Sequence, residues 1–302
     1  MLEEGATFCG FVAIVGRPNV GKSTFLNHIL GEKVSITSRK PQTTRHRLLG
    51  VKTLGLAQIV YVDTPGMHIG RKRALNQFMN KEARLALIDV DVVIFMVESL
   101  KWTEEDQLVL DVLIKAKCPV ILAVNKADSV HEKTALFPYL QKLSEKFNFS
   151  DIIPVSAKRG TNLETLEQKV ISYLPQSPHY FPENQITDKP VPFRIAEIIR
   201  EKIIRSLGEE LPYTTTVEIE AYQPDKVTLI SAIIWVEREG QKPIIIGKAG
   251  ERIKEIGRRA RLDIEKLLHN RVHLKLWVKI RDGWSDDKKA LQNLGYIDTS
   301  DL

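Results

Sequence analysis

The stretch that decides the fold is FVAIVGRPNVGKSTFLN, residues 11–27. Its first part, residues 11–16, is a continuous apolar run, which is typical of a strand buried on both faces of a parallel sheet. It leads directly into GRPNVGKS, residues 16–23, which matches the phosphate-loop pattern GxxxxGK[ST] between a strand and a helix. Glycines let backbone N–H groups surround phosphate oxygens, and the following helix N-terminus adds partial positive charge. The stretch therefore predicts a nucleotide-binding loop; the alternative is a turn that binds nothing.

Within this loop, Lys22 and Ser23 carry the chemistry. A lysine at this place reaches the β- and γ-phosphates, and a serine hydroxyl beside it ligates Mg²⁺. We therefore expect Lys22 to act on the phosphates and Ser23 to bind the metal ion.

Around this loop, the first 175 residues alternate short apolar runs with longer amphipathic stretches, for example residues 75–89 and 163–174. Further strand-like runs are at 59–63, 92–97, 120–125 and 152–156. Such alternation predicts an α/β domain with a doubly wound, mostly parallel sheet. Residues 47–63 instead predict a hairpin that turns near Gly55, so that one edge strand is antiparallel.

Three further motifs follow predicted strands: DTPG at 63–66, NKAD at 125–128 and SAK at 156–158. The carboxyl ends of parallel strands are where α/β proteins bind ligands. Asp128 can accept hydrogen bonds from guanine N1–H and the 2-amino group, whereas adenine offers no donor there, so guanine is favoured. Each motif alone is weak, because NKAD could be a solvated turn, but their order and placement predict a guanine nucleotide.

The order GxxxxGKS, TT, DTPG, NKAD, SAK resembles the translation-factor class of GTPases, and PQTTRHR at 41–47 resembles switch I of its Era branch. The resemblance implies that Thr44 is a second hydroxyl ligand to Mg²⁺ that is released on hydrolysis; Thr43 is the alternative. Met67 and His68 stand where Ras-like enzymes have a water-orienting Gln, which implies slow intrinsic hydrolysis. In relatives with this change an asparagine of the loop recruits K⁺, and Asn19 is at the matching position.

These considerations define the expected site. The catalytic positions are Lys22, Thr44 and Gly66, and the metal positions are Ser23, Thr44 and Asp63 for Mg²⁺ and Asn19 for K⁺. The nucleotide-binding positions are Gly16, Arg17, Pro18, Asn19, Val20, Gly21, Lys22, Ser23, Thr24, Asp63, Gly66, Asn125, Lys126, Asp128, Ser156, Ala157 and Lys158.

Residues 175–192 contain five prolines and no apolar period, which predicts an extended, exposed linker. We expect a GTP-binding domain at 1–176, the linker at 177–192, and a second domain at 193–302. The second domain combines a helix, two alternating strands, a GxxG turn at 247–250, a charged helix and a strand. This order resembles an α-first (type II) KH domain, a small α+β fold, although a helix-start turn of an interaction domain is the alternative.

A KH fold implies RNA binding, because two glycines let a sugar–phosphate backbone approach closely and lysine or arginine can meet phosphates. Residues 242–281 hold twelve basic and four acidic residues, a net charge of +8, whereas the whole chain has a net charge of +6. Trp235, Trp277 and Trp284 are interpreted as core or groove wall. The expected RNA-binding positions are Ile246, Gly247, Lys248, Ala249, Gly250, Arg252, Lys254 and Arg258.

Composition excludes several classes for this 302-residue chain. Its apolar share of 43% argues against disorder, and its apolar runs are too short to span a bilayer. The acidic start lacks a signal-peptide layout, and two cysteines without a CxxC motif fit a reduced cytoplasm.

The combination of domains, with the ending KIRDGWSDDKKALQNLGY at 279–296, resembles the Era family of bacterial ribosome-assembly GTPases over nearly the whole chain. The resemblance implies a GTP/GDP switch with Mg²⁺ that binds the 3′ end of small-subunit ribosomal RNA in 30S maturation. It also implies a monomer and a peripheral association with the inner membrane. Two alternatives remain: an RNA-binding scaffold whose nucleotide site is only a sensor, and a small-molecule kinase or ATPase, which NKAD and SAK oppose.

Overall fold

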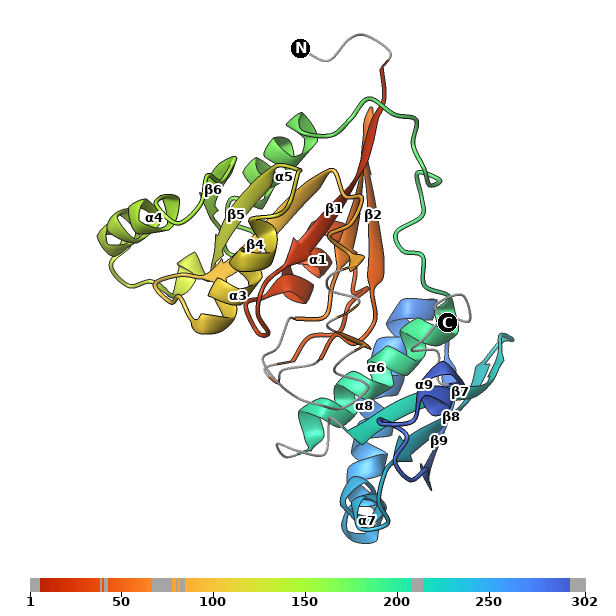
Figure 1. Cartoon of the computed structure of the whole chain (residues 1–302). Helices are drawn as coiled ribbons and strands as arrows, with labels where there is room; N and C mark the ends of the chain where they lie inside the picture. Colours follow the sequence, from red (N-terminus) through yellow and green to blue (C-terminus); the bar gives the residue numbers. More distant parts are fainter. Residues whose placement is uncertain are drawn as a thin grey trace. The chain divides into compact units, whose positions relative to one another are not determined.

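A computed structural model describes residues 6–38, 40, 43–66, 78–79, 81, 85–207 and 214–293. The chain divides into two compact units (Figure 1). Of the described residues, the first unit contains 6–35, 44–66, 79, 81 and 85–188, and the second contains 36–38, 40, 43, 78, 189–207 and 214–293. Within these residues no helix combines the length and apolar composition that crossing a bilayer requires.

The first unit is built on one six-stranded sheet (Figure 1). Its strands are β1 (Phe8–Val15), β2 (Leu48–Leu54), β3 (Ala57–Asp63), β4 (Val92–Glu98), β5 (Val120–Asn125) and β6 (Asp151–Pro154). The spatial order is β2-β3-β1-β4-β5-β6, and each pair is parallel except β2 with β3. The predicted hairpin is thus confirmed; its turn at Gly55 has φ 59°, a left-handed conformation that glycine adopts without strain.

Helices cover both faces of this sheet, as a doubly wound fold requires. They are α1 (Lys22–Leu30), α3 (Glu104–Leu113), α4 (Leu136–Ser144) and α5 (Leu163–Ser172), with short 3₁₀ turns η1 (Ala127–Ser129) and η2 (Lys133–Ala135). On one face, Tyr61 meets Phe25 of α1 edge-on and donates a hydrogen bond to Glu167 of α5. On the other face, Phe95 and its neighbours pack with Leu110 of α3 in a fully buried cluster. The predicted helix at 75–89 lies largely outside the described residues.

The segment predicted as an exposed linker has no buried residue between 177 and 188, but up to residue 188 it is also hydrogen-bonded to the first unit. Val51 N donates to Ile186 O (2.8 Å) at the edge strand β2. The fully buried Gln58 accepts from Tyr180 N (2.9 Å) and Phe181 N (3.0 Å), and its Nε2 donates to Phe181 O (2.8 Å). An edge strand presents unpaired N–H and C=O groups, so a passing extended chain can pair with it even when rich in proline.

The second unit has the predicted order of elements. They are α6 (Val191–Ser206), β7 (Thr215–Gln223), β8 (Thr228–Val236), α7 (Gln241–Ile246), η4 (Lys248–Gly250), α8 (Glu251–Leu268), β9 (Val272–Ile280) and α9 (Lys288–Asn293). The sheet order is β7-β8-β9, antiparallel then parallel. Ile195 and Ile199 of α6 and Ile256 and Ile264 of α8 are buried at helical spacing and form the core with β8.

Three details of this unit differ from or refine the prediction. The short helix α7 contains Pro243 and was not predicted. Trp284 is fully buried and donates to Thr214 O, whereas Trp277 is 55% exposed and is not part of the core; its interpretation as groove wall stays a prediction. The described part of residues 36–43 also belongs to this unit: Thr37 N donates to Glu201 Oε1 (3.1 Å) of α6.

Candidate nucleotide-binding site

The phosphate loop has the backbone conformation that its glycines permit. Gly16 has φ 150° and Gly21 has φ 107°, a region that side chains rarely allow. A Cβ on Gly16 would lie 2.4 Å from Met96 O, and a Cβ on Gly21 would lie 2.3 Å from Asn125 Nδ2. Glycine is therefore required at both positions, because of the loop conformation and because the loop lies close to β4 and β5.

Lys22 lies at the first residue of α1 and is 6% exposed. Its Nζ donates to Gly16 O (2.8 Å) and Arg17 O (3.0 Å), which holds the ammonium over the loop. Burial lowers the pKa of Lys22 to about 8, and the nearby Asp63 carboxylate opposes this shift. The side chain is therefore still a cation at neutral pH, at the place where a nucleotide phosphate would bind.

The three residues predicted to hold Mg²⁺ come together. Ser23 Oγ and Thr44 Oγ1 share a hydrogen bond of 2.9 Å, and Ser23 Oγ donates to Asp63 Oδ2 (3.2 Å). Thr43 Oγ1 instead donates to Lys40 O (2.7 Å), so the geometry favours Thr44.

Asp63 itself is fully buried, and its Oδ1 has no hydrogen-bond partner among the described residues. Burial raises the pKa of Asp63, although Lys22, Ser35 and Ser23 act in the opposite direction. A buried carboxylate oxygen without a partner, beside two hydroxyls, is a donor set that suits a hard cation such as Mg²⁺. The residues present therefore fit the metal ion that the family implies.

The motifs predicted to read the base also converge on the loop. Asn125 Nδ2 donates to Val20 O (2.7 Å), and its Oδ1 accepts from Ala157 N (2.9 Å). Ser156 Oγ donates to Asp128 Oδ1 (2.7 Å). The SAK motif thus orients the NKAD motif, and Asn125 joins both to the phosphate loop.

The remaining predicted positions lie around this core. Pro18 and Thr24 are partly buried, Val20 is buried, and Asn19 and Lys158 are exposed; Asn19 has φ 64°. Gly66 lies against the loop, because a Cβ there would be 2.9 Å from Pro18 N. Met67 and His68 lie outside the described residues, so the predicted absence of a water-orienting side chain stays a prediction.

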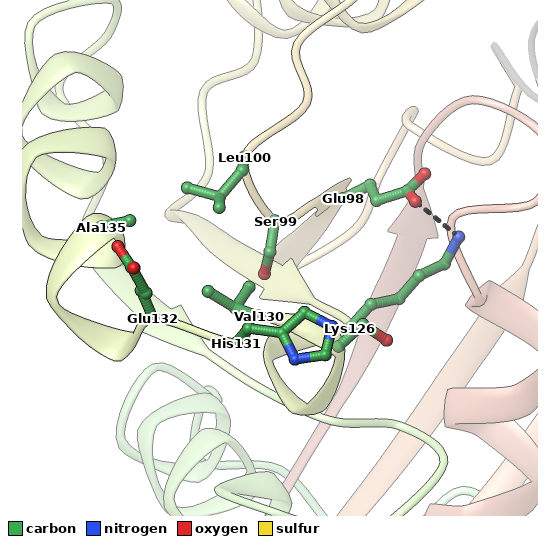
Figure 2. Close-up of a pocket in the computed structure, with 9 residues that line it drawn as sticks. Glu98, Ser99, Leu100, Lys126, Val130, His131, Glu132 and Ala135 are labelled. Carbon is green, nitrogen blue, oxygen red and sulfur yellow. Dashed lines mark ion pairs between the residues drawn. The ribbon is translucent and has the colours of Figure 1, made fainter.

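Sequence reasoning missed a group of charges behind the loop. Arg17 was predicted as a nucleotide contact, yet its guanidinium pairs with Glu98 (2.7 Å) and Asp106 (3.1 Å) and is directed away from solvent. Its contribution to a nucleotide would therefore come from its backbone. Lys126 pairs with the same Glu98, at one side of a pocket of about 460 Å³ (Figure 2).

In the second unit the GxxG turn has the expected strained backbone. Gly247 and Gly250 have φ 75° and 77°, and Ala249 between them has φ 51°. A Cβ on Gly247 would lie 2.7 Å from the Cβ of Arg252, so this position needs glycine, whereas a Cβ on Gly250 would meet open space.

The predicted RNA-contacting side chains of this turn and of α8 are mostly free to reach solvent. Lys248, Arg252 and Lys254 are exposed, and Ile246 is partly buried. Arg258 is exposed too but forms a bidentate pair with Glu255 (2.8 and 2.9 Å). Hydrogen bonds from Arg258 and Arg259 lower the pKa of Glu255 to about 2, so part of the positive charge of α8 is neutralised locally.

Comparison with known proteins agrees with both units. A family model described as 50S ribosome-binding GTPase matches residues 11–126, and one described as KH domain matches residues 210–285. The GTPase Era of Azotobacter vinelandii is 59% identical over 300 residues, which are 99% of this chain and 100% of that protein. The GTPase Era of Marinobacter nauticus is 58% identical over 98% of this chain and 97% of that protein.

Two solved structures are similar along nearly the whole chain. One is a Tyr-to-Ala variant of Aquifex aeolicus Era bound to GDP·AlF4⁻, with a TM-score of 0.93 and 40% identity over 96% of this chain and 99% of that chain. The other is Era in complex with MgGDPNP and nucleotides 1506–1542 of 16S ribosomal RNA, with the same TM-score, identity and coverage.

Proposed function

The chain belongs to the Era family of GTPases, and from that premise we propose that it is a GTP-driven switch that binds the 3′ end of small-subunit ribosomal RNA. Hydrolysis of GTP to GDP and phosphate is its activity. The observation that carries the proposal is the convergence of Ser23, Thr44 and Asp63 beside the buried Lys22, in the same chain as an exposed GxxG turn.

In this mechanism the chain mainly positions charge. Lys22 holds the β- and γ-phosphates, and backbone N–H groups of residues 16–23 surround them. Ser23, Thr44 and Asp63 would hold Mg²⁺, which when bound neutralises charge on the transferred phosphoryl group. Asp128, held by Ser156 at 2.7 Å, reads the guanine.

Chain continuity supports a coupling between the nucleotide and the second unit. Thr44 lies with the phosphate loop, whereas the described residues of 36–43 directly before it group with the second unit. In that unit Arg205 Nη2 donates to Thr37 O (3.0 Å), and Arg200 Nη2 donates to Thr43 O. We infer that release of Thr44 after hydrolysis loosens one end of residues 36–43, and that this changes the RNA binding of the second unit, to which these residues are hydrogen-bonded.

The RNA side of the proposal rests on the GxxG turn and the +8 charge of residues 242–281. A relative of 40% identity binds nucleotides 1506–1542 of 16S ribosomal RNA. Gly250→Asp is the test, because an added side chain meets open space and brings only strain and a negative charge. Gly250→Asn is the matched control, since Asn has the same shape without charge and tolerates a positive φ.

We expect Gly250→Asp to weaken binding of a labelled 16S 3′-end RNA by at least about tenfold, and Gly250→Asn by less than about threefold. Basal GTP hydrolysis should be unchanged in both variants. Equal RNA affinities for the aspartate variant and the wild-type protein would remove the RNA role from this turn.

The scaffold alternative, in which hydrolysis is incidental, is separated by Lys22→Ala. This change should abolish tight nucleotide binding and leave RNA binding by the second unit intact. If ribosome assembly in cells proceeds normally with Lys22→Ala, the nucleotide site is dispensable and the scaffold reading replaces the switch. ATP that competes equally with GTP would instead favour the kinase or ATPase alternative.

We further propose that K⁺ accelerates hydrolysis through Asn19. The asparagine is exposed on the phosphate loop and has φ 64°. Replacing Na⁺ by K⁺ should raise the rate with or without RNA, and Asn19→Ala should remove the increase. A rate that does not respond to the exchange in either condition rules this role out.

We also propose that the protein is a cytoplasmic monomer that acts in 30S maturation and associates peripherally with the inner membrane. Two free cysteines fit a reducing compartment, and the basic window could attract anionic lipid. Sedimentation of the purified protein and fractionation of cells at low and high salt test these points. A stable dimer, or recovery only in a detergent-requiring membrane fraction, would contradict them.

A further inference from the structure

Glu98, the last residue of β4, lies between the phosphate loop and the base-reading motif. Its Oε2 is 2.7 Å from Arg17 Nη2, and its Oε1 is 3.1 Å from Lys126 Nζ. Figure 2 shows Lys126 extended toward Glu98 along one side of the pocket. One carboxylate therefore joins two of the motifs that form the nucleotide site.

The loop side of this bridge is rigidly held. Arg17 Nε also pairs with Asp106 (3.1 Å), which is fully buried and forms a capping box with Thr103 at the start of α3. The carbonyl of Arg17 accepts the hydrogen bond from Lys22 Nζ (3.0 Å). Arg17 therefore contacts both Glu98, through its guanidinium, and the phosphate-binding Lys22, through its carbonyl oxygen.

On the base-reading side, the backbone of Lys126 is in an unfavourable conformation that its neighbours must hold. Lys126 has φ 64°, a left-handed conformation that is unfavourable for a non-glycine residue and persists only where neighbours impose it. Ser99, next to Glu98, donates from both N and Oγ to Asn125 O (2.8 Å each). The end of β4 therefore holds the backbone of the NKAD motif through Ser99 and its lysine side chain through Glu98.

The charge on Glu98 is secure. Burial alone would raise its pKa, but hydrogen bonds from Arg17 and Lys126 outweigh this and lower the pKa. The carboxylate is therefore ionised at neutral pH and available to both cations.

We propose that Glu98 is a positioning residue for the guanine nucleotide, whose carboxylate fixes the Lys126 side chain relative to the phosphate loop and so sets how long GDP and GTP stay bound. The inference rests on the nucleotide site described above. It assigns to Glu98 a contact with the site's own residues, not with the nucleotide.

The test is the dissociation rate of a fluorescent GDP analogue from the full-length protein with Mg²⁺. Because the side chains of Glu98 and Lys126 are 24% and 36% exposed, solvent screens the pair. Glu98→Gln should therefore accelerate dissociation by about tenfold, the lower end for a hydrogen bond to a charged group. Glu104→Gln, at an exposed glutamate in the first turn of α3, is the matched control and should leave the rate within about twofold.

A double-mutant cycle distinguishes positioning from a general loss of structure. In a Lys126→Met background Glu98→Gln should add less than about twofold, because the partner is already absent. If the full tenfold effect persists in that background, or if Glu98→Gln alone leaves the rate unchanged, the proposal is wrong. Wild-type protein that fails to bind GDP would instead refute the nucleotide site itself.

Glu98→Asp covers the case in which Glu98→Gln is poorly folded. It keeps the charge but retracts the carboxylate by one methylene, so the dissociation rate should lie between those of the wild type and Glu98→Gln. A thermal midpoint equal to that of the wild type together with an unchanged rate for Glu98→Asp would also overturn the positioning role.

Discussion

Gly21→Ala is the substitution whose effect the structure defines most closely. The new Cβ would lie 2.3 Å from Asn125 Nδ2, which is far inside van der Waals contact, and Gly21 has φ 107°. Asn125 must therefore move, which breaks its hydrogen bonds to Val20 O (2.7 Å) and from Ala157 N (2.9 Å). The added methyl thus separates the phosphate loop from the base-reading motifs.

The magnitude follows from two contributions. A left-handed non-glycine residue costs about 1–2 kcal/mol, and a buried polar group left unsatisfied costs about 1–3 kcal/mol. We take about 3 kcal/mol in total. If this cost destabilises the conformation that binds GDP, GDP binding becomes about a hundredfold weaker. Calorimetric titration with GDP at constant Mg²⁺ measures it.

Gly31→Ala is the matched control. Gly31 ends α1 with φ 69°, but a Cβ there has nothing within 4 Å. This variant should lose about 1 kcal/mol of unfolding free energy and bind GDP like the wild-type protein. If Gly21→Ala binds GDP within about threefold of the wild type, or if Gly31→Ala weakens GDP binding equally, the reasoning from close approach is refuted.

Three other substitutions test separate parts of the account. Asp63→Asn should remove Mg²⁺-dependent GTP binding, yet it should raise the unfolding free energy of the nucleotide-free protein by about 1 kcal/mol, since a buried anion is lost. Because the pKa of Asp63 is raised in the folded protein, this gain in unfolding free energy should disappear as the pH falls through that pKa. Denaturation at several pH values measures both effects. Ala249→Gly removes a left-handed alanine (φ 51°) and should stabilise the second unit by about 1 kcal/mol in urea unfolding; a destabilised variant would mean that the turn is unstrained. Glu255→Gln should free Arg258 and Arg259, tighten RNA binding by about threefold and steepen its salt dependence in anisotropy titrations, whereas an unchanged salt slope would show that these arginines do not meet phosphates.

Motifs that depend on chain spacing could be predicted from the sequence. The phosphate loop, the antiparallel hairpin and the order of the KH unit follow from periodicity and glycine placement, and the structure bears them out. The resemblance implied Thr44 rather than Thr43, and the hydrogen bond between Thr44 and Ser23 favours that choice; residue spacing alone does not, because adjacent loop residues differ only in the direction of their side chains.

Interactions between distant residues were not predictable in this way. Glu98 ends an apolar strand and Asp106 lies in the first turn of a helix, and nothing in their spacing indicates that Arg17 lies between them. The proline-rich segment was interpreted from composition alone, which cannot show that Gln58 binds its backbone. In both cases a single buried polar group determines the local arrangement, and such a group leaves no periodic signal.

The proposed function requires that the nucleotide state controls RNA binding. The most direct measurement is the affinity of the full-length protein for a 16S 3′-end RNA, with saturating GDPNP and with saturating GDP, at fixed salt and Mg²⁺. We predict that the two affinities differ by at least about tenfold, which is about 1.4 kcal/mol of coupling, and that Lys22→Ala removes the difference. Equal affinities in the two nucleotide states, with both nucleotides shown to be bound, would contradict it.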